Sequence, residues 1–218
     1  MATMATSRKL QKPSQIALPL VAEGAGAAQR IVIGNANSSV IEALQSPDNW
    51  PFHTAVLTGP PRSGKSLLGR WTQSKGIEVI DGADRHDEAD IFHRWNAVQE
   101  GGSRAGQPLL LIADTTPWEI TLPDLRSRLG GSLQLALDEP DDQMAAGLIE
   151  AHAEARRLTL SEGAADYLVP RTRRSFADIE ALVAAIDRIS LERAHPATMS
   201  VWRAALEALH GPDQQKLL

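Results

Sequence analysis

The stretch HTAVLTGPPRSGKSLLGRW, residues 53–71, joins an apolar run to a helical pattern through a loop of Gly, Pro and Ser. Residues 59–66, GPPRSGKS, fit G-x-x-x-x-G-K-[ST] at every fixed position, after a predicted strand and before a predicted helix. Glycines let backbone N–H groups close around phosphate oxygens, and the start of a helix adds its positive dipole end. The stretch therefore predicts a phosphate-binding loop in an α/β fold.

The loop supplies most of the predicted nucleotide ligands. Lys65 is expected to reach the β- and γ-phosphates, and the Ser66 hydroxyl is expected to ligate Mg²⁺, so that ADP or ATP with Mg²⁺ is the expected cofactor. The alternative is a Gly/Ser turn that happens to precede a helix, and the complete motif in its strand–helix context argues against it. The predicted contact residues are Gly59, Pro60, Pro61, Arg62, Ser63, Gly64, Lys65 and Ser66.

A carboxylate from a neighbouring strand is expected to complete the metal site. Asp81 ends the apolar run IEVID and is therefore the predicted partner of Ser66 at Mg²⁺. Gly82 follows where many hydrolysing P-loop proteins carry a second acid, and Asp84 is another source of a carboxylate nearby. The competing interpretation of Asp81 is an ordinary turn acid at the end of a strand.

The pattern of the chain predicts two folded parts between two tails. Apolar strand patterns alternate with helical ones as far as residue 139, which predicts a parallel sheet covered on both faces. After Pro140 only helical patterns follow, so a small all-helical lid is expected behind the sheet. The expected divisions are a flexible tail (1–28), the base domain (29–139), the lid (140–210) and a second tail (211–218). Strands are expected over 53–59, 77–82, 108–114 and 132–138, a strand or turn over 30–35, and helices over 38–44, 66–75, 87–100, 141–157, 161–168, 176–193 and 200–209. The helix over 176–193 is indicated by an apolar stripe along one face and by the capping pattern SFAD at residues 175–178.

Composition limits the classes of function. The chain of 218 residues has no cysteine, which excludes disulfides and cysteine-ligated metal sites. Its net charge of −5 argues against a general nucleic-acid coat. Pro19 interrupts the short apolar patch over 16–22, and no apolar run is long enough to cross a bilayer. A cytoplasmic protein with no membrane contact is expected.

Four segments resemble the DnaA/Hda family of AAA+ ATPases, and within it the short Hda type that lacks a DNA-binding domain. They are the phosphate loop, IDGADR (80–85), LLLIADTTP (109–117) and LPDLRSRL (122–129), and the resemblance extends over nearly the whole chain. It implies a AAA+ base with a helical lid, a sensor role for Asp114, and an arginine finger at Arg128 that acts on a neighbouring ATPase. It also implies no direct sequence-specific DNA binding.

The chain departs from the family pattern at three places. Gly82 replaces the second acid, and Ala177 stands where the lid normally carries a sensor arginine, which makes Arg174 the candidate substitute for nucleotide binding. The interval between Ser66 and residue 77 has room for one helix only, so a trimmed sheet is expected.

The tail contains QIALPL, residues 15–20, which resembles the hexapeptide that docks replication proteins on the β sliding clamp of DNA polymerase III. An extended peptide of this kind buries alternate apolar side chains in a preformed pocket while the glutamine amide fixes its orientation. The alternative is a strand that packs on its own domain. The predicted clamp contacts are Gln15, Ile16, Leu18, Pro19 and Leu20.

The resemblance implies an Hda-like regulator of replication initiation. Such a protein would bind adenine nucleotide, dock on the DNA-loaded clamp and stimulate ATP hydrolysis by DnaA through Arg128, with weak hydrolysis of its own. Two alternatives stay open: an autonomous DnaA-like ATPase or loader, and a clamp-tethered adaptor that does not hydrolyse nucleotide. A homodimer is also possible.

Overall fold

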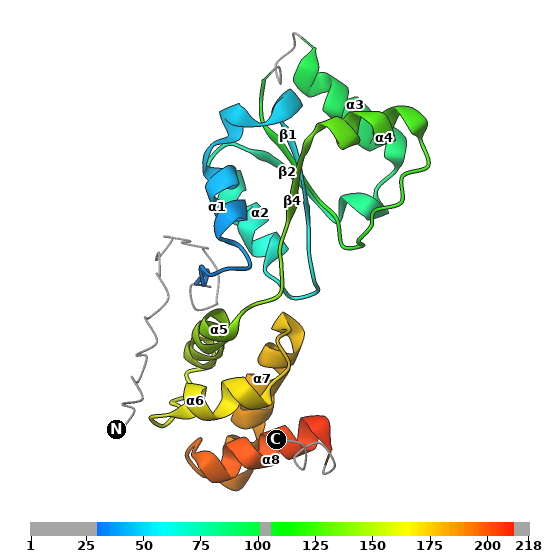
Figure 1. The fold of residues 1–218 in the computed structure, drawn as a ribbon. Helices are drawn as coiled ribbons and strands as arrows, with labels where there is room; N and C mark the ends of the chain where they lie inside the picture. The colour runs from blue at the N-terminus through cyan, green and yellow to red at the C-terminus, as the bar shows by residue number, and fades with distance from the viewer. Residues whose placement is uncertain (1–29, 101–105, 212–218) are drawn as a thin grey trace, which may run out of the picture.

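The computed structural model describes residues 30–100 and 106–211, and it confirms the predicted α/β class with a parallel sheet. The sheet has four strands, and a group of helices lies beyond it along the chain (Figure 1). The strand order is β2-β3-β1-β4 and all three pairings are parallel. The strands are β1 (Thr54–Thr58), β2 (Glu78–Asp81), β3 (Leu109–Ile112) and β4 (Leu133–Ala136).

The strand register aligns the carboxyl ends of the four strands. Leu57 of β1 pairs with Ile112 of β3 and with Leu135 of β4, and Asp81 of β2 pairs with the same Ile112. These four residues therefore form one row across the sheet. The phosphate loop, which begins at Gly59, leaves the sheet at this edge, where ligands of open α/β sheets bind.

Helices cover both faces of the sheet, as expected for parallel strands (Figure 1). One face packs against α1 (Ser38–Gln45) and α2 (Lys65–Gln73), and the other against α3 (Glu88–Gln99) and α4 (Pro123–Gly131). Successive strand residues point to opposite faces, so both faces need apolar side chains. For this reason β3 reads Leu-Leu-Leu-Ile without alternation and is buried throughout.

The structure gives β2 an unpaired outer edge. Only α2 lies between β1 and β2, so the predicted trimmed sheet is present and β2 is its edge strand. Of the two possibilities for residues 30–35, the structure shows irregular backbone and a turn. The buried side chain of Asn37 fixes this segment: its Nδ2 donates to Val32 O at 2.8 Å and its Oδ1 accepts from Gly34 N at 3.0 Å.

The helical part has its own apolar core. Its helices are α5 (Asp142–Ala155), α6 (Ala164–Leu168), α7 (Phe176–Arg193) and α8 (Met199–His210). Along α7, Ile179 and Ile186 are fully buried against the other helices. Ser175 Oγ accepts a hydrogen bond from Asp178 N at 3.1 Å, which is the N-terminal cap expected from the sequence SFAD.

Four short 3₁₀ segments complete the structure: η1 (Pro47–Asn49), η2 (Pro51–His53), η3 (Ala83–Arg85) and η4 (Val169–Arg171). None of the helices in the described ranges has the length and apolar character needed to span a membrane.

Candidate functional site

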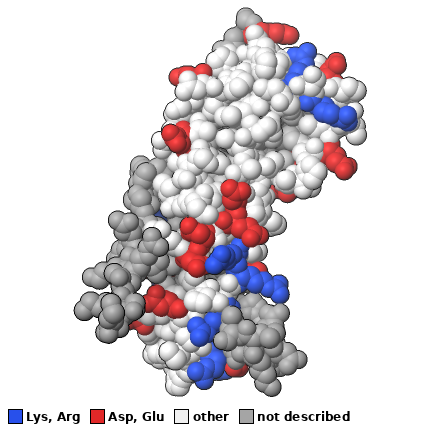
Figure 2. Space-filling model, viewed as in Figure 1, with Lys and Arg blue, Asp and Glu red and all other residues white. Residues whose placement is uncertain are grey.

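A cavity of about 660 Å³ lies between the phosphate loop and the helical part. Its walls come from the turn before α1, the phosphate loop with the start of α2, Asp114 after β3, and the facing sides of α5 and α7. On the face shown in Figure 2, charged side chains gather where the sheet part meets the helical part. Ten of the lining residues are Ile31, Asn37, Arg62, Ser63, Lys65, Ser66, Met144, His152, Arg156 and Glu180.

The two glycines of the motif are required for different structural reasons. A Cβ on Gly59 would lie 2.7 Å from Leu137 Cβ, so a side chain there would push the loop off β4. Gly64 has φ +88°, a left-handed conformation that glycine adopts without strain, and it lets the chain turn into α2. The loop shape is thus set by contacts already present in the fold.

Polar groups of the loop point into a ready anion site. Lys65 is buried, with Nζ donating to Gly59 O at 2.8 Å and to Pro60 O at 3.1 Å. Ser63 Oγ is buried without a hydrogen-bond partner among the described residues. The first N–H groups of α2 have no acceptor within the helix and carry its positive dipole end. A buried hydroxyl without a partner, free N–H groups at a helix start and a buried cation together fit a phosphate chain.

An ion-pair network joins this loop to the lid across the cavity. The two carboxylate oxygens of Glu180 of α7 form ion pairs, one at 3.4 Å from Arg62 Nε and the other at 3.9 Å from Arg156 Nη2. Arg156 follows the end of α5, and its side chain is 26% exposed, whereas that of Arg62 is 69% exposed. Both arginines line the cavity, so two cations beside Lys65 share one internal carboxylate.

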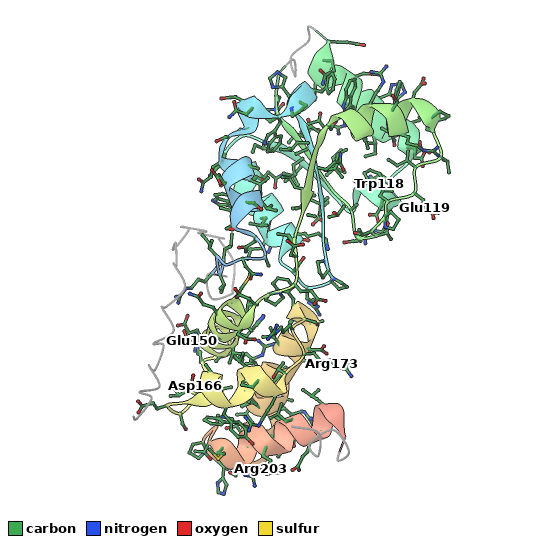
Figure 3. The ribbon with its side chains drawn as sticks, in the orientation of Figure 1. Trp118, Glu119, Glu150, Asp166, Arg173 and Arg203 are labelled. Atoms are coloured by element: carbon green, nitrogen blue, oxygen red, sulfur yellow. The ribbon has the colours of Figure 1, made fainter. Side chains whose placement is uncertain are left out.

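Two arginines of the helical part, Arg174 and Arg156, lie at different places relative to the cavity. Arg174 Nε pairs with Asp142 Oδ1 at 2.9 Å, its side chain is 63% exposed, and it is not among the cavity residues. Ala177 is exposed and also outside the cavity lining. Arg156 lies inside the lining and was missed by the sequence reasoning, because its position depends on how α5 docks beside the loop. Figure 3 shows Arg173 near the start of α7, on the helical part.

His152 of α5 lines the same cavity. Its burial lowers the pKa of the imidazole, an effect that nearby Glu180 opposes and Arg156 reinforces. The net direction is downward, so the neutral form of His152 is favoured at neutral pH.

The acids at the carboxyl edge have different surroundings. Asp114 lines the main cavity two residues after β3, and Arg85 Nη1 pairs with its carboxylate. Asp81 is exposed and borders a second cavity of about 610 Å³ on the outer side of β2. In the described part of the chain, no group of three His, Asp or Glu side chains forms a metal cluster, so any Mg²⁺ site here would draw on phosphate oxygens and water as well.

Asp84 does not replace the missing second acid, because its carboxylate is already used. It accepts from Asp114 N at 3.0 Å, Thr115 N at 2.8 Å and Thr115 Oγ1 at 2.8 Å. Burial alone would raise the pKa of Asp84, but these hydrogen bonds together outweigh it and hold the pKa below its ordinary value. Asp84 therefore fixes the loop that carries Asp114.

A side chain at position 82 would overlap the side chain of Arg85. Gly82 has φ +69°, and a Cβ there would overlap the guanidinium of Arg85. Arg85 is held in that place by its ion pair with Asp114. The residue after Asp81 is thus a glycine, and the side chain of Arg85 packs on it. The second carboxylate that many hydrolysing P-loop proteins carry at this position is replaced by this arrangement.

Arg128 lies near the amino ends of the strands, whereas the phosphate loop leaves the sheet at their carboxyl ends. It belongs to the last turn of α4, and α4 leads into β4, whose first residue Leu133 pairs with Ala55 near the start of β1. The phosphate loop leaves the other end of the five-residue β1, which at about 3.3 Å per residue is about 15 Å away along the strand. Arg128 is consequently out of reach of the phosphate loop of its own chain.

The guanidinium of Arg128 is held by α3. Its Cζ lies 4.7 Å from the centre of the Phe92 ring and 4.6 Å from that of Trp95, and its Nη1 donates to Asn96 Oδ1 at 2.7 Å. The adjacent Arg126 donates to Ile120 O, in the loop before α4. The predicted clamp-docking residues 15–20 lie outside the described residues.

No family model matches the chain. Among solved structures it is similar to domain III of the Thermotoga maritima replication initiation protein DnaA, with a TM-score of 0.66 and 13% identity over 84% of this chain and 95% of that one. It is similar to the Thermotoga maritima RuvB Holliday junction branch migration motor, with a TM-score of 0.57 and 18% identity over 83% and 72% of the two chains. A replication initiator DnaA bound to AMPPCP and single-stranded DNA gives a TM-score of 0.51 and 18% identity over 75% and 66%. The shared architecture is the AAA+ P-loop fold.

Proposed function

We propose that this chain is a DnaA-related regulator that binds adenine nucleotide with Mg²⁺ in its own cavity and supplies Arg128 to the ATP site of a neighbouring DnaA molecule. The observation that carries the proposal is the position of Arg128 at the end of the sheet remote from Gly59. An arginine so placed does not reach the nucleotide cavity of its own chain, and a finger supplied in trans accelerates phosphoryl transfer by about 10³–10⁵ in well-studied NTPases.

The cavity residues fit the nucleotide. Lys65, Ser63 Oγ and the start of α2 present donors to a phosphate chain, and Arg62 and Arg156 add charge at its entrance. Ser66 would hold Mg²⁺ from within this cavity, and the bound ion would neutralise charge on the phosphates. Asp81, its expected partner, borders the second cavity, so its share in the metal site stays a prediction. The choice of an adenine nucleotide draws on the similarity to the DnaA structure that contains AMPPCP.

Weak hydrolysis by the chain itself follows from the carboxyl edge. A second acid after Asp81 would orient the attacking water, and here Gly82 and Arg85 occupy that region instead. Asp84, the nearest other acid, is bound to the loop over Asp114 and Thr115. The chain would therefore hold its nucleotide as a structural signal while Arg128 acts elsewhere.

Docking on the β sliding clamp through Gln15, Ile16, Leu18, Pro19 and Leu20 is the part of the proposal that draws on sequence alone. Because a ring-shaped clamp offers identical sites, two docked copies would gain by avidity although one short peptide binds weakly.

The experiment is ATP hydrolysis by DnaA with clamp and DNA, comparing the intact chain, Arg128→Ala and a chain that lacks residues 1–22. Stimulation that requires both Arg128 and the tail is expected, with nucleotide binding by Arg128→Ala unchanged. Stimulation that persists in Arg128→Ala would refute the finger. Substantial basal turnover by the purified chain, abolished by Asp81→Ala, would favour the autonomous ATPase. Failure to bind ADP or ATP at millimolar concentration in calorimetry would favour the adaptor.

A further inference from the structure

We infer that α3 is a positioning element for Arg128, and that Phe92, Trp95 and Asn96 hold its guanidinium ready for a phosphate of the neighbouring subunit. This inference rests on the proposed role of Arg128. It gives a function to three residues that have none in that proposal. The three residues stand at i, i+3 and i+4, so they share one face of α3. That face is the one turned toward α4, and Arg128 lies against it.

The contacts restrict the guanidinium in two different ways. The rings of Phe92 and Trp95 lie close to Cζ, at distances where the ring faces attract a cation. Asn96 Oδ1 accepts one N–H in the plane of the group at 2.7 Å and so sets its rotation. A guanidinium has five N–H donors, and the other four are not used by Asn96. Arg128 as a whole residue is only partly buried.

The backbone of Arg128 is tied to the same helix. Ser132 Oγ donates to Arg128 O at 3.1 Å, and Trp95 Nε1 approaches Ser132 Oγ at 3.4 Å. Trp95 is 5% exposed, so this chain of contacts is well protected from water. Contacts with α3 thus restrain Arg128 both at its backbone and at its guanidinium, so the side chain has few rotamers left.

Such restraint has a specific kinetic consequence. A flexible surface arginine loses rotamer entropy when it engages a phosphate, whereas a held one has lost most of that entropy already. The benefit appears in the transition state, where a rigid planar fork meets the transferring phosphoryl group. Loss of the α3 contacts should therefore lower the maximal stimulated rate and leave the concentration of chain that gives half-maximal stimulation almost unchanged.

The first measurement does not depend on DnaA. The Nε–Hε resonance of Arg128, assigned with Arg128→Lys, is expected to be displaced by the ring currents of Phe92 and Trp95. Phe92→Leu should move it toward the position of a free arginine, and Phe92→Tyr, which keeps the ring, should not. An undisplaced resonance in the intact chain would show that Arg128 is not held by α3 in solution and would overturn the inference.

The second measurement is stimulated hydrolysis by DnaA as a function of chain concentration. Phe92→Leu and Asn96→Ala are expected to lower the maximal rate about 5- to 20-fold with half-maximal concentration within about twofold. Phe92→Tyr should retain the rate. Gln99→Ala is the matched control on α3, because Gln99 Nε2 donates to Phe52 O and not to a group of Arg128.

The outcomes separate the two proposals. A raised half-maximal concentration with an unchanged maximal rate would make α3 a contact surface and overturn the positioning role, as would unchanged kinetics in both variants. If the intact chain does not stimulate DnaA at all, the proposed function fails, while the resonance of Arg128 still decides whether α3 holds the guanidinium. Circular dichroism of each variant verifies that a lost rate is not a lost fold.

Discussion

Glu180 of α7 and Arg62 of the phosphate loop form an ion pair across the cavity, with 3.4 Å between Arg62 Nε and Glu180 Oε2. The other carboxylate oxygen of Glu180 faces Arg156 at 3.9 Å. One lid carboxylate is therefore shared by two cavity arginines that a polyphosphate would also attract. A bound nucleotide and Glu180 compete for the same charges, which links the state of the loop to the position of the lid.

Replacing Glu180 tests this competition. Glu180→Gln keeps the shape of the side chain and removes its charge, so Arg62 and Arg156 become free to engage phosphate. Since an exposed pair contributes about 0–1 kcal/mol, the affinity for ADP in calorimetry is expected to rise about 2- to 5-fold. Glu192→Gln is the control, because Glu192 pairs with Arg188 on α7 and lies outside the cavity lining. An unchanged or weaker affinity in Glu180→Gln would contradict the competition.

The two lid arginines are predicted to differ. Arg156→Ala should weaken ADP binding about 3- to 10-fold, because it removes a half-buried cation from the cavity wall. Arg174→Ala should leave the affinity unchanged within about twofold, because Arg174 pairs with Asp142 outside the lining. Parallel titrations of both variants decide between them. The reverse order would restore Arg174 as the lid contact and remove Arg156 from the site.

Lys65 is expected to matter for binding far more than for folding. Lys65→Ala removes a buried ammonium whose present partners, Gly59 O and Pro60 O, belong to the loop itself. Charged hydrogen bonds contribute about 1.5–3 kcal/mol each, so a loss of about 100-fold in ADP affinity is expected, with a melting temperature close to that of the intact chain. Lys75→Ala serves as the control, since Lys75 lies over the Trp71 ring at the other end of the helix. Normal ADP binding by Lys65→Ala would show that the nucleotide does not bind in this cavity.

Acid is predicted to loosen the loop before α4. Glu88 accepts from Thr121 N and Leu122 N at 2.8 and 2.6 Å, and these backbone hydrogen bonds lower the pKa of Glu88 below its ordinary 4.5. A lowered folded-state pKa stabilises the fold fully above the unfolded value and is lost as the pH falls through the folded value. In urea unfolding, Glu88→Gln should therefore be less stable than the intact chain at pH 7, and the difference should shrink as the pH falls below the ordinary pKa of 4.5 and toward the lowered folded-state pKa.

Glu119→Gln is the control for this pH dependence, because Glu119 lies in the same loop (Figure 3) and makes no hydrogen bond or ion pair with the residues that the structure describes. A difference between Glu88→Gln and the intact chain that stays constant from pH 7 to pH 3 would show that the carboxylate hydrogen bonds are not its source.

The elements of the fold were predictable to different degrees. Apolar runs predicted all four strands, and the apolar stripe of α7 together with the cap at Ser175 predicted that helix over residues 176–193, where it is found. The sequence pattern did not indicate α4, because PDLRSRLGG ends in two glycines and has only Leu125 and Leu129 to bury. That helix is stabilised by contacts with α3, which are tertiary and have no local signal.

The same distinction holds for the candidate site. The loop between β1 and α2 lies where the sequence motif predicted it, because the motif consists of residues adjacent in the chain, and its contacts with phosphate stay a prediction. Arg156 was missed, and Asp84 was considered for a role that its hydrogen bonds preclude. Both depend on which segments distant in sequence meet at the carboxyl edge of the sheet, and a single sequence does not encode that as a local pattern.

Gly82 offers the sharpest test of why the chain should hydrolyse its nucleotide poorly. Gly82→Asp restores an acid after Asp81, but the new Cβ would overlap the guanidinium of Arg85 and sit at φ +69°. We expect no gain in basal ATP turnover and a loss of about 1–2 kcal/mol in unfolding free energy. Gly76→Asp is the matched control: Gly76 has φ +86° with open space around a Cβ, so it bears the backbone cost alone. Equal losses in the two variants would show that Arg85 yields easily, and a rise in turnover in Gly82→Asp would show that the missing acid alone had limited hydrolysis.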